Sequence, residues 1–310
     1  MIVRAATPAD STTVYALLDR APRQRVQLGA EDIATALATD HCLLLYAEEH
    51  AAAPLLALLI TVAEVRPPSL PAAAPDRIYV RGVAFHASCS PTTGLQHLLR
   101  AFATRAMRNP HPHQLIAYGG EGWLDRALRD AGMHLADRVQ FFALERLQQR
   151  TWSAPAPAIA IARTIRNATP ADLTPLAHLD SQTFDPLWHY SQRHLQDALL
   201  QGPLLVAIAG EELIGYIALQ FEQATCTIAR LAVHPQHQGR GYGRALLLAG
   251  LQLAQQWGCS RVLLNTQATN HRSQQLYRSL GFRPTGESFA VFVLDLPDPL
   301  SPPAVTEHAA

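Results

Sequence analysis

The chain has 310 residues, of which 48% are hydrophobic and 16% charged, so it can bury the cores of two globular domains and is neither disordered nor fibrous. Its 25 basic and 25 acidic side chains leave a formal net charge of zero, which argues against the basic excess of a nucleic-acid-binding surface. A neutral bulk charge still allows a small basic substrate, which needs only a local acidic pocket.

The first element in chain order, Val3–Asp10, is predicted as a short strand followed by a helix that starts at Thr-Pro. No basic and apolar leader precedes it, and the most apolar run, Ala51–Ala63, contains Pro54 and is too short to cross a bilayer. We therefore expect a cytoplasmic protein with no membrane contact. The cysteines lack C-x-x-C spacing and lie in apolar contexts, as buried thiols do in a reducing compartment: Cys42, Cys89, Cys226 and Cys259.

The chain repeats itself in three places, in the same order, which predicts two copies of one unit. Val3–Asp10 resembles Ile165–Asp172, Val83–His86 resembles Leu231–His234, and Leu128–Met133 resembles Tyr277–Phe282. Between the copies, Trp152–Ala158 is a Pro/Ala spacer typical of an interdomain linker. We expect a first domain over residues 1–150, a linker over 151–162, a second domain over 163–296 and a disordered tail over 297–310.

The second copy alternates strand and helix patterns. Strands are predicted over 163–167, 204–209, 213–221, 225–233, 261–267 and 289–294, and helices over 170–184, 191–201, 241–257 and 271–280. The order indicates an α/β fold with a mixed, mostly antiparallel sheet flanked by helices. In the first copy, the run around His111 and His113 lies between prolines and is expected to be a solvated loop.

The most informative stretch runs from Leu231 to Leu247, where a strand ends, a Gly-rich turn follows and a helix begins. Free backbone N–H groups at a helix start attract negative charge, and residues without side chains let a phosphate approach the backbone. The turn combines three glycines with two cations, in the order Gly239, Arg240, Gly241, Gly243 and Arg244. A pyrophosphate cradle is one interpretation, and a tight strand-to-helix turn without ligand is the other.

Two motifs resemble those of the GNAT superfamily of N-acetyltransferases. Gln238–Gly243 resembles its Gln/Arg-x-x-Gly-x-Gly/Ala motif, and Asn265–Phe282 resembles its second motif, Asn…(Ala/Ser)…Tyr…Gly-Phe. The resemblance covers residues 163–296 well and reaches the first copy only through the repeat. It implies two tandem acyl-CoA N-acyltransferase domains, as in the mycothiol synthases, where one copy is spent.

This resemblance implies specific roles in binding acetyl-CoA. The pyrophosphate would lie on the loop, and the pantetheine arm would pair with the preceding strand like another strand. A backbone N–H there would polarise the thioester carbonyl. Asn270 would hydrogen-bond the arm, and Tyr277 would protonate the leaving CoA thiolate as general acid. The cofactor residues are Leu231, Ala232, Val233, Gln238, Gly239, Arg240, Gly241, Tyr242, Gly243, Arg244 and Asn270.

Structural alternatives stay open for several residues. Asn270 directly precedes a helix and could act as its N-cap, alone or in addition to binding the cofactor. Tyr277 could be a core tyrosine with a satisfied hydroxyl. His234 and His237 have H-x-x-H spacing, but they lie in the cofactor loop without an obvious third ligand, so we expect no metal.

The general base is missing from the expected strand. Thr225–Leu231 contains no carboxylate, so Glu222, Asp185 and His189 are the candidates, acting through water. The acceptor pocket of this fold is lined by the loop between the first two helices, here Phe184–Tyr190. Its aromatic rings beside Asp185 could hold a cationic amine, or they could only pack the helices together.

The first copy has lost its counterparts of the motif, because Ala87–Gly94 keeps one glycine and no basic residue, and Leu128 replaces the tyrosine.

The leading hypothesis is an enzyme that transfers acetyl from acetyl-CoA to a primary amine of a small molecule or peptide. The alternative is a non-catalytic acyl-CoA-binding sensor or scaffold. The sequence leaves a homodimer open.

Overall fold

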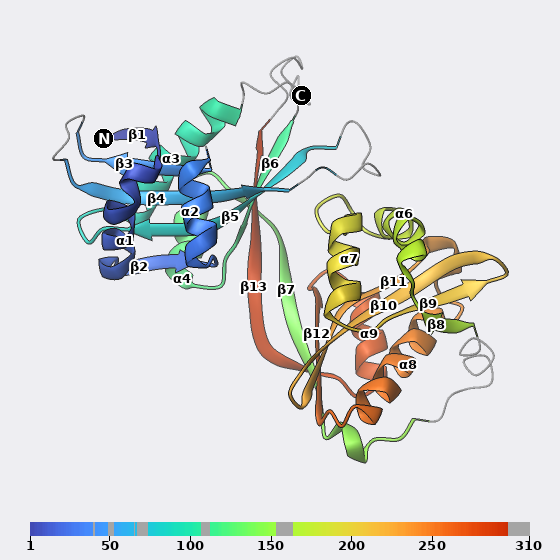
Figure 1. Cartoon of the computed structure of the whole chain (residues 1–310). Helices are drawn as coiled ribbons and strands as arrows, with labels where there is room; N and C mark the ends of the chain where they lie inside the picture. Colours follow the sequence, from blue (N-terminus) through green and yellow to red (C-terminus); the bar gives the residue numbers. More distant parts are fainter. Residues whose placement is uncertain are drawn as a thin grey trace, which may run out of the picture. The chain divides into compact units, whose positions relative to one another are not determined.

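The computed structural model describes residues 1–39, 41–48, 53–64, 66, 74–106, 112–152 and 164–296, which form two compact units (Figure 1). Unit 1 takes its described residues from 1–64, 74–137 and 289–296. Unit 2 takes residues 138–152 and 164–288, together with Arg66. The predicted linker beyond Trp152 and the predicted tail lie outside the described residues.

Unit 1 is a mixed sheet with helices on both faces. Its strands are β1 (Ile2–Ala5), β2 (Arg23–Val26), β3 (Cys42–Tyr46), β4 (Leu55–Ala63), β5 (Asp76–Phe85) and β6 (His113–Tyr118), and its helices are α1 (Ser11–Arg20), α2 (Ala30–Ala38), α3 (Pro91–Ala106) and α4 (Gly122–Asp130). The strand order is β1-β3-β4-β5-β6, and β2 pairs with β5. The helices α1 and α2 pack over one core, and α3 and α4 pack over the other.

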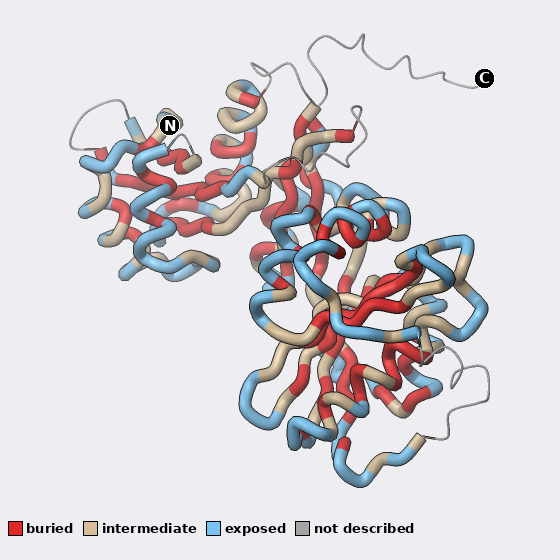
Figure 2. The backbone as a smooth tube through the Cα atoms, turned by 45° about the vertical axis from the view of Figure 1, so that its right-hand side comes forward, coloured by how far each residue is buried: buried red, intermediate tan, exposed pale blue. Residues whose placement is uncertain are grey.

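Unit 2 has the same architecture. Its strands are β8 (Ile165–Asn167), β9 (Leu204–Ala209), β10 (Glu212–Glu222), β11 (Thr225–Val233) and β12 (Arg261–Gln267), and its helices are α6 (Leu173–Thr183), α7 (Gln192–Gln201), α8 (Tyr242–Gln256) and α9 (His271–Ser279). The order β8-β9-β10-β11-β12 repeats that of unit 1. The mixed sheet flanked by helices confirms the predicted fold class. Figure 2 shows the buried residues concentrated along the strands and the inner faces of the helices.

The final strand of each repeat completes the sheet of the other unit. Strand β7 (His134–Glu145) follows α4 but pairs with β12, in the register from Val139 opposite Gln267 to Glu145 opposite Arg261. Strand β13 (Arg283–Leu296) follows α9, yet its residues from Val291 onward pair with β6. The units therefore differ from the contiguous segments 1–150 and 163–296 drawn from the sequence. Local patterns mark strands but carry no information on which of two equivalent edges a strand joins.

Each repeat starts with the same capping motif at the beginning of its first helical segment. Thr169 and Asp172 bracket a single 3-10 turn, and the Asp172 carboxylate accepts hydrogen bonds from the Thr169 N–H at 2.7 Å and from Arg166 Nη1 at 2.8 Å. Thr7, Asp10 and Arg4 repeat this arrangement in unit 1. Such caps satisfy backbone donors that a helix start leaves free, which explains why the Thr-Pro-Ala-Asp sequence begins a helical segment twice.

One loop prediction was wrong. His113 does not lie in a solvated loop but begins β6, where it is 7% exposed, while His111 is outside the described residues. The cause is the parallel pairing of β6 with β5, which buries a segment whose prolines had indicated a turn. The four cysteines are free and buried, as predicted.

Candidate active site

The candidate site lies where β11 and β12 separate. These parallel strands pair only from Thr225 opposite Arg261 to Ile228 opposite Leu264. A bulge at Ala229 shifts the register of β11 against β10 at this point. Beyond it, the edge of residues 229–233 that faces away from β10 has no strand partner among the described residues. This edge therefore offers unused backbone donors and acceptors.

The Gly-rich loop connects this open edge to α8. Gly239 and Gly241 have φ of 81° and 94°, a region that favours glycine, and Gly241 is the N-cap of α8. Gln238 anchors the loop, since its Nε2 donates to the Val233 carbonyl at 2.9 Å. The first backbone bond of the helix is from Ala245 N–H to the Gly241 carbonyl, so the N–H groups of the first turn remain available to an anion.

Three arginines lie at or near this loop. Arg240 is exposed in the loop, and Arg244 in α8 donates from Nη1 to Ser279 Oγ at 3.1 Å. Sequence reasoning missed the third, Arg272, which donates from Nη1 to Gln238 Oε1 at 2.6 Å. Its position two residues after Asn270, inside the second motif, was a signal that could have found it. The loop and the start of α9 thus form one positively charged surface.

A pocket of about 70 Å³ opens between the separated strands. Its walls bring together residues that the sequence analysis singled out from both motifs, and they also include side chains from β7 and the α6–α7 segment. The described lining residues are Val139, Phe184, Trp188, Ile228, Ala229, Arg230, Leu231, Asn265, Thr266, Gln267, Asn270, Ser273 and Tyr277. The predicted residues Leu231, Asn270 and Tyr277 therefore share one cavity. Ala232 and Val233 instead turn their side chains toward the cores of unit 2.

Tyr277 is 5% exposed and packs against the rings of Phe142 and Phe282. Burial raises the pKa of its hydroxyl to about 12, against the smaller lowering effects of Ser273 and Arg230. The hydroxyl therefore keeps its proton at neutral pH. Asn270 Oδ1 accepts a hydrogen bond from Ser273 N–H at 3.1 Å, which makes it the N-cap of α9 in addition to a pocket residue.

None of the three candidate bases lines this pocket. Glu222 is exposed at the end of β10, and Asp185 is exposed in the segment after α6. His189 is buried, with its Nδ1 donating to the Pro186 carbonyl at 2.9 Å. The described lining contains no carboxylate, so the pocket itself supplies no side-chain base of that kind.

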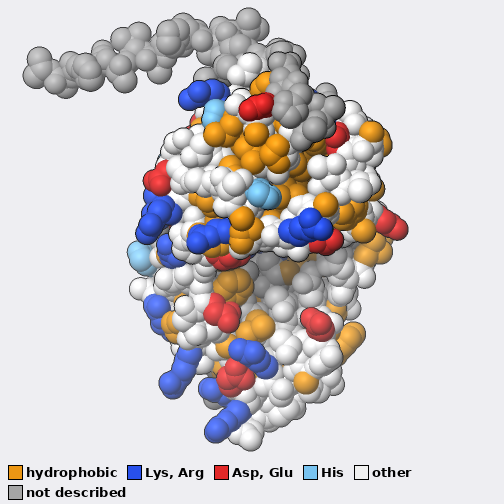
Figure 3. All heavy atoms as spheres, turned by 90° about the vertical axis from the view of Figure 1, so that its left-hand side faces the viewer, with side chains coloured by type: hydrophobic (Ala, Val, Ile, Leu, Met, Phe, Trp, Pro, Cys, Tyr) orange, Lys and Arg blue, Asp and Glu red, His pale blue; other side chains and the backbone are white. Residues whose placement is uncertain are grey.

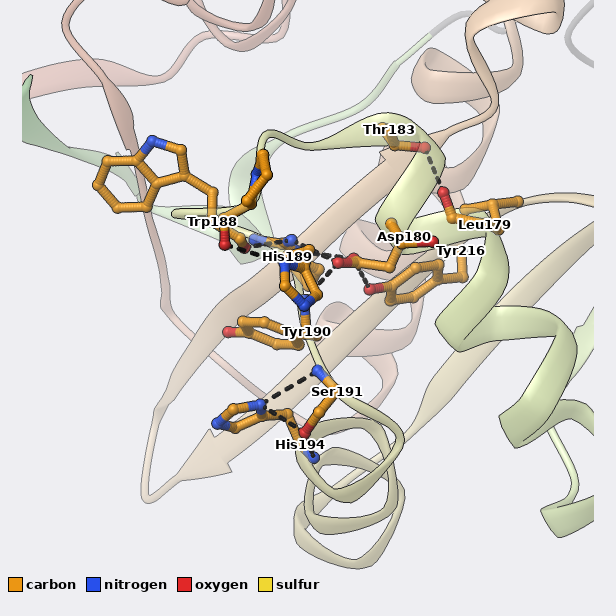
Figure 4. Close-up of polar contacts among 12 residues, drawn as sticks. Leu179, Asp180, Thr183, Trp188, His189, Tyr190, Ser191, His194 and Tyr216 are labelled. Atoms are coloured by element: carbon orange, nitrogen blue, oxygen red, sulfur yellow. Dashed lines mark hydrogen bonds and ion pairs between the residues drawn. The ribbon is translucent and has the colours of Figure 1, made fainter. Parts of the chain in front are cut away.

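A buried ion pair beside the pocket was not foreseen. Asp180 in α6 is fully buried and accepts from Arg230 Nε at 2.9 Å, from Arg230 Nη2 at 2.8 Å, from the Tyr190 N–H and from the Tyr216 hydroxyl (Figure 4). The Arg230 guanidinium carbon lies 3.5 Å from the centre of the Phe184 ring and 4.1 Å from that of the Tyr190 ring. Burial opposes the charge of Arg230, but Asp180 outweighs it and holds the arginine pKa above its ordinary value.

We expect Asp180→Ala to destabilise unit 2 by about 3–5 kcal/mol, because it leaves the Arg230 charge buried without its partner. Denaturant unfolding followed by far-ultraviolet circular dichroism measures this loss. Asp172→Ala is the control, since its partner Arg166 is 44% exposed and can be solvated by water. Equal losses in the two variants would contradict the importance of the buried pair.

In unit 1, the edge of β5 that corresponds to the open edge of β11 is covered by another strand. Strand β2 pairs with β5 from Arg23 opposite Phe85 to Val26 opposite Gly82. The same residues of β5 pair with β4 on their other side. By the repeat, Val83–Phe85 corresponds to Leu231–Val233, so a segment of the chain itself covers the counterpart of the open edge. The cavity left at this position has only about 10 Å³.

Comparison with known proteins agrees with this geometry. Residues 173–282 match the acetyltransferase (GNAT) family. This range contains the open edge, the Gly-rich loop and the pocket. The similarity to the GNAT family of acetyltransferases therefore applies to this part of unit 2.

Among curated relatives, N-acetyltransferase family 8 member 3 of Rattus norvegicus is 33% identical over 94 residues, which are 28% of this chain and 41% of the relative. The putative ribosomal protein bS18 alanine N-acetyltransferase of Bacillus subtilis is 24% identical, over 39% of this chain and 82% of the relative. The chain thus spans less than half the length of the first of these relatives.

Two solved structures share the fold over nearly the whole chain. A GCN5-related N-acetyltransferase from Sphaerobacter thermophilus has a TM-score of 0.58 at 14% identity, covering 95% of both chains. A tandem GNAT protein from the clavulanic acid biosynthesis pathway has a TM-score of 0.55 at 16% identity, covering 96% of this chain and 98% of that one. The two-unit arrangement is therefore a tandem GNAT fold. No helix in the described part of the chain is long and apolar enough to cross a membrane.

Proposed function

We propose that unit 2 transfers an acetyl group from acetyl-CoA to a primary amine. The observation that carries this proposal is the open edge of residues 229–233, which leads directly into the Gly-rich loop and the start of α8. An arm with amide groups fits that edge as a strand would, and a pyrophosphate fits the free N–H groups and arginines of the loop. Both relatives named above are described as N-acetyltransferases, the one from Bacillus subtilis as a putative one.

The chemistry is direct attack by the neutral amine on the thioester carbonyl. A nitrogen–carbon bond forms and the carbon–sulfur bond breaks, while a backbone N–H of the open edge stabilises the developing oxyanion. Tyr277 donates its proton to the departing CoA sulfur, for which its raised pKa keeps it protonated. The proton lost by the amine goes to water, since the described pocket lining offers no carboxylate. The free, buried cysteines are consistent with a cytoplasmic location.

We propose further that unit 1 holds no acyl-CoA. Its β2 occupies the edge of β5 that corresponds to the cofactor edge of β11. Arg25 fixes this strand by donating from Nη1 to the Gly119 carbonyl at 2.9 Å, and the Arg23 guanidinium carbon lies 5.9 Å from the centre of the Trp123 ring. A pantetheine arm would have to displace four paired residues to bind there.

Calorimetric titration with acetyl-CoA tests both statements. We expect one site per chain, weakened about tenfold or more by Gly239→Ala, because a Cβ there would lie 3.2 Å from Arg272 Nη2 and strain a φ of 81°. Gly258→Ala is the matched control, with a φ of 77° and no atom within 4 Å of the new Cβ, so it adds similar strain away from the loop. Two sites per chain would contradict the closed edge of unit 1, and no binding would contradict the proposed cofactor.

A second candidate function is acyl-CoA binding without turnover. The pocket lining that lacks a carboxylate favours it, since nothing there would deprotonate an ammonium group directly. Release of CoA in the presence of a panel of amines separates the two functions, because a binding module would hold acetyl-CoA without consuming it.

A further inference from the structure

Arg230 is the only charged side chain among the described residues that line the pocket. Its Nε and Nη2 are used within the protein, toward Asp180 and toward the Trp188 carbonyl at 2.7 Å. Its Nη1 has no hydrogen-bond partner among the described residues, and the Arg230 side chain is 11% exposed. One nitrogen of a rigidly held guanidinium is therefore available to a ligand.

The surroundings of Arg230 disfavour a strongly cationic acceptor. The rings of Phe184 and Tyr190 could have formed a cage for an ammonium group, but the protein's own guanidinium lies against both of them. Asp185, which the sequence placed beside these rings, is exposed and absent from the pocket lining. The Asp180 carboxylate accepts four hydrogen bonds within the protein, two of them from Arg230, so it is not available to a cationic acceptor. Correspondingly, no acidic side chain faces the described pocket.

We propose that the acceptor is an amine that carries a carboxylate beside its nitrogen, as an α-amino acid does, and that Arg230 Nη1 binds this carboxylate. A short link between the two groups fits the site, because Arg230 directly precedes Leu231 of the open edge and both line the same pocket. A carboxylate on Arg230 would hold the neighbouring amine in the same cavity as Tyr277 and Leu231. The inference rests on the proposed acetyl transfer and names its substrate class.

Matched acceptors test the proposal on the unmodified protein. Free α-amino acids are compared with the corresponding amino-acid amides and decarboxylated amines, by CoA release and by the mass of the acetylated product. We expect kcat/KM for the carboxylate form to exceed that of its amide by about 100-fold or more, since the charged partner of Arg230 is lost. The chain contains 25 arginines and no lysine, so no lysine side chain of its own competes as acceptor.

The variant Arg230→Lys keeps a cation opposite Asp180 but removes the forked donor, so the preference for carboxylates should fall about tenfold or more. Arg166→Lys, at an ion pair whose arginine is exposed, is the control and should keep the preference unchanged. Equal rates for acids and amides in the unmodified protein would overturn the inference while leaving acetyl transfer intact. A uniform loss for all acceptors in Arg230→Lys would also overturn it, because the arginine would then act on the thioester or Tyr277. Absence of transfer to every acceptor would overturn the proposed function together with the inference.

Discussion

Replacing Tyr277 by phenylalanine is expected to lower kcat about 10²- to 10⁴-fold while leaving the affinity for acetyl-CoA nearly unchanged. The hydroxyl is the only group the substitution removes, and Tyr277 lines the pocket together with Leu231 and Asn270. Because Phe142 and Phe282 already surround the ring, a phenylalanine fits the same space. Steady-state rates at saturating acetyl-CoA, paired with calorimetric binding, measure the two quantities separately.

The pH dependence gives an independent check on the role of Tyr277. A general acid works in its protonated form, and the pKa of about 12 means that this form persists through neutral and moderately alkaline pH. The rate should therefore show no loss from Tyr277 until the pH approaches 12. Ser273→Ala removes a side chain that lowers this pKa and should change kcat only slightly. An unchanged kcat in Tyr277→Phe would make the residue a core tyrosine, the alternative that the sequence left open.

The fold and much of the site could be predicted because both depend on local patterns. The strand Thr225–Val233 and the strand Arg261–Gln267 have the bounds expected from their alternating apolar residues. The positive φ of Gly239 and Gly241 gives a physical reason for the glycines of the loop. Tyr277 and Leu231 lie far apart in the sequence but line one pocket, as the two motifs together implied.

The remaining features depend on contacts that local patterns do not encode. Asp180 and Arg230 are 50 residues apart, and a lone aspartate in an amphipathic helix is normally a solvated residue. Strand β2 has the polar sequence Arg-Gln-Arg-Val, which by itself is typical of a loop. It forms a strand because it pairs with the edge of β5. The pairing partners of β7 and β13 could not be predicted, because both repeats provide an equivalent edge.

This exchange of strands leads to a second strong expectation, for fragments of the chain. A fragment of residues 164–288, which lacks β7, should not fold, whereas residues 138–288 should fold and bind acetyl-CoA. Three residues in β7 or just after it are fully buried in the core of unit 2: Phe142, Leu144 and Leu147. Each such side chain contributes about 2–5 kcal/mol, and together they rival the total stability of about 5–15 kcal/mol of a typical domain. Circular dichroism and thermal melts of the two fragments measure the difference.

Loss of β7 also removes part of the site. Val139 lines the pocket, and Phe142 packs against the Tyr277 ring, so a fragment without β7 would lack one pocket wall even if the rest stayed compact. Residues 138–288 with Phe142→Ala are the intermediate control, expected to fold with a loss of about 3–5 kcal/mol. If residues 164–288 folded as stably as 138–288 and bound acetyl-CoA equally well, β7 would be a dispensable edge strand. The contiguous division at the linker would then describe the folding units better than the exchange does. Failure of the shorter fragment alone would mean that unit 2 depends on a strand encoded by the first repeat.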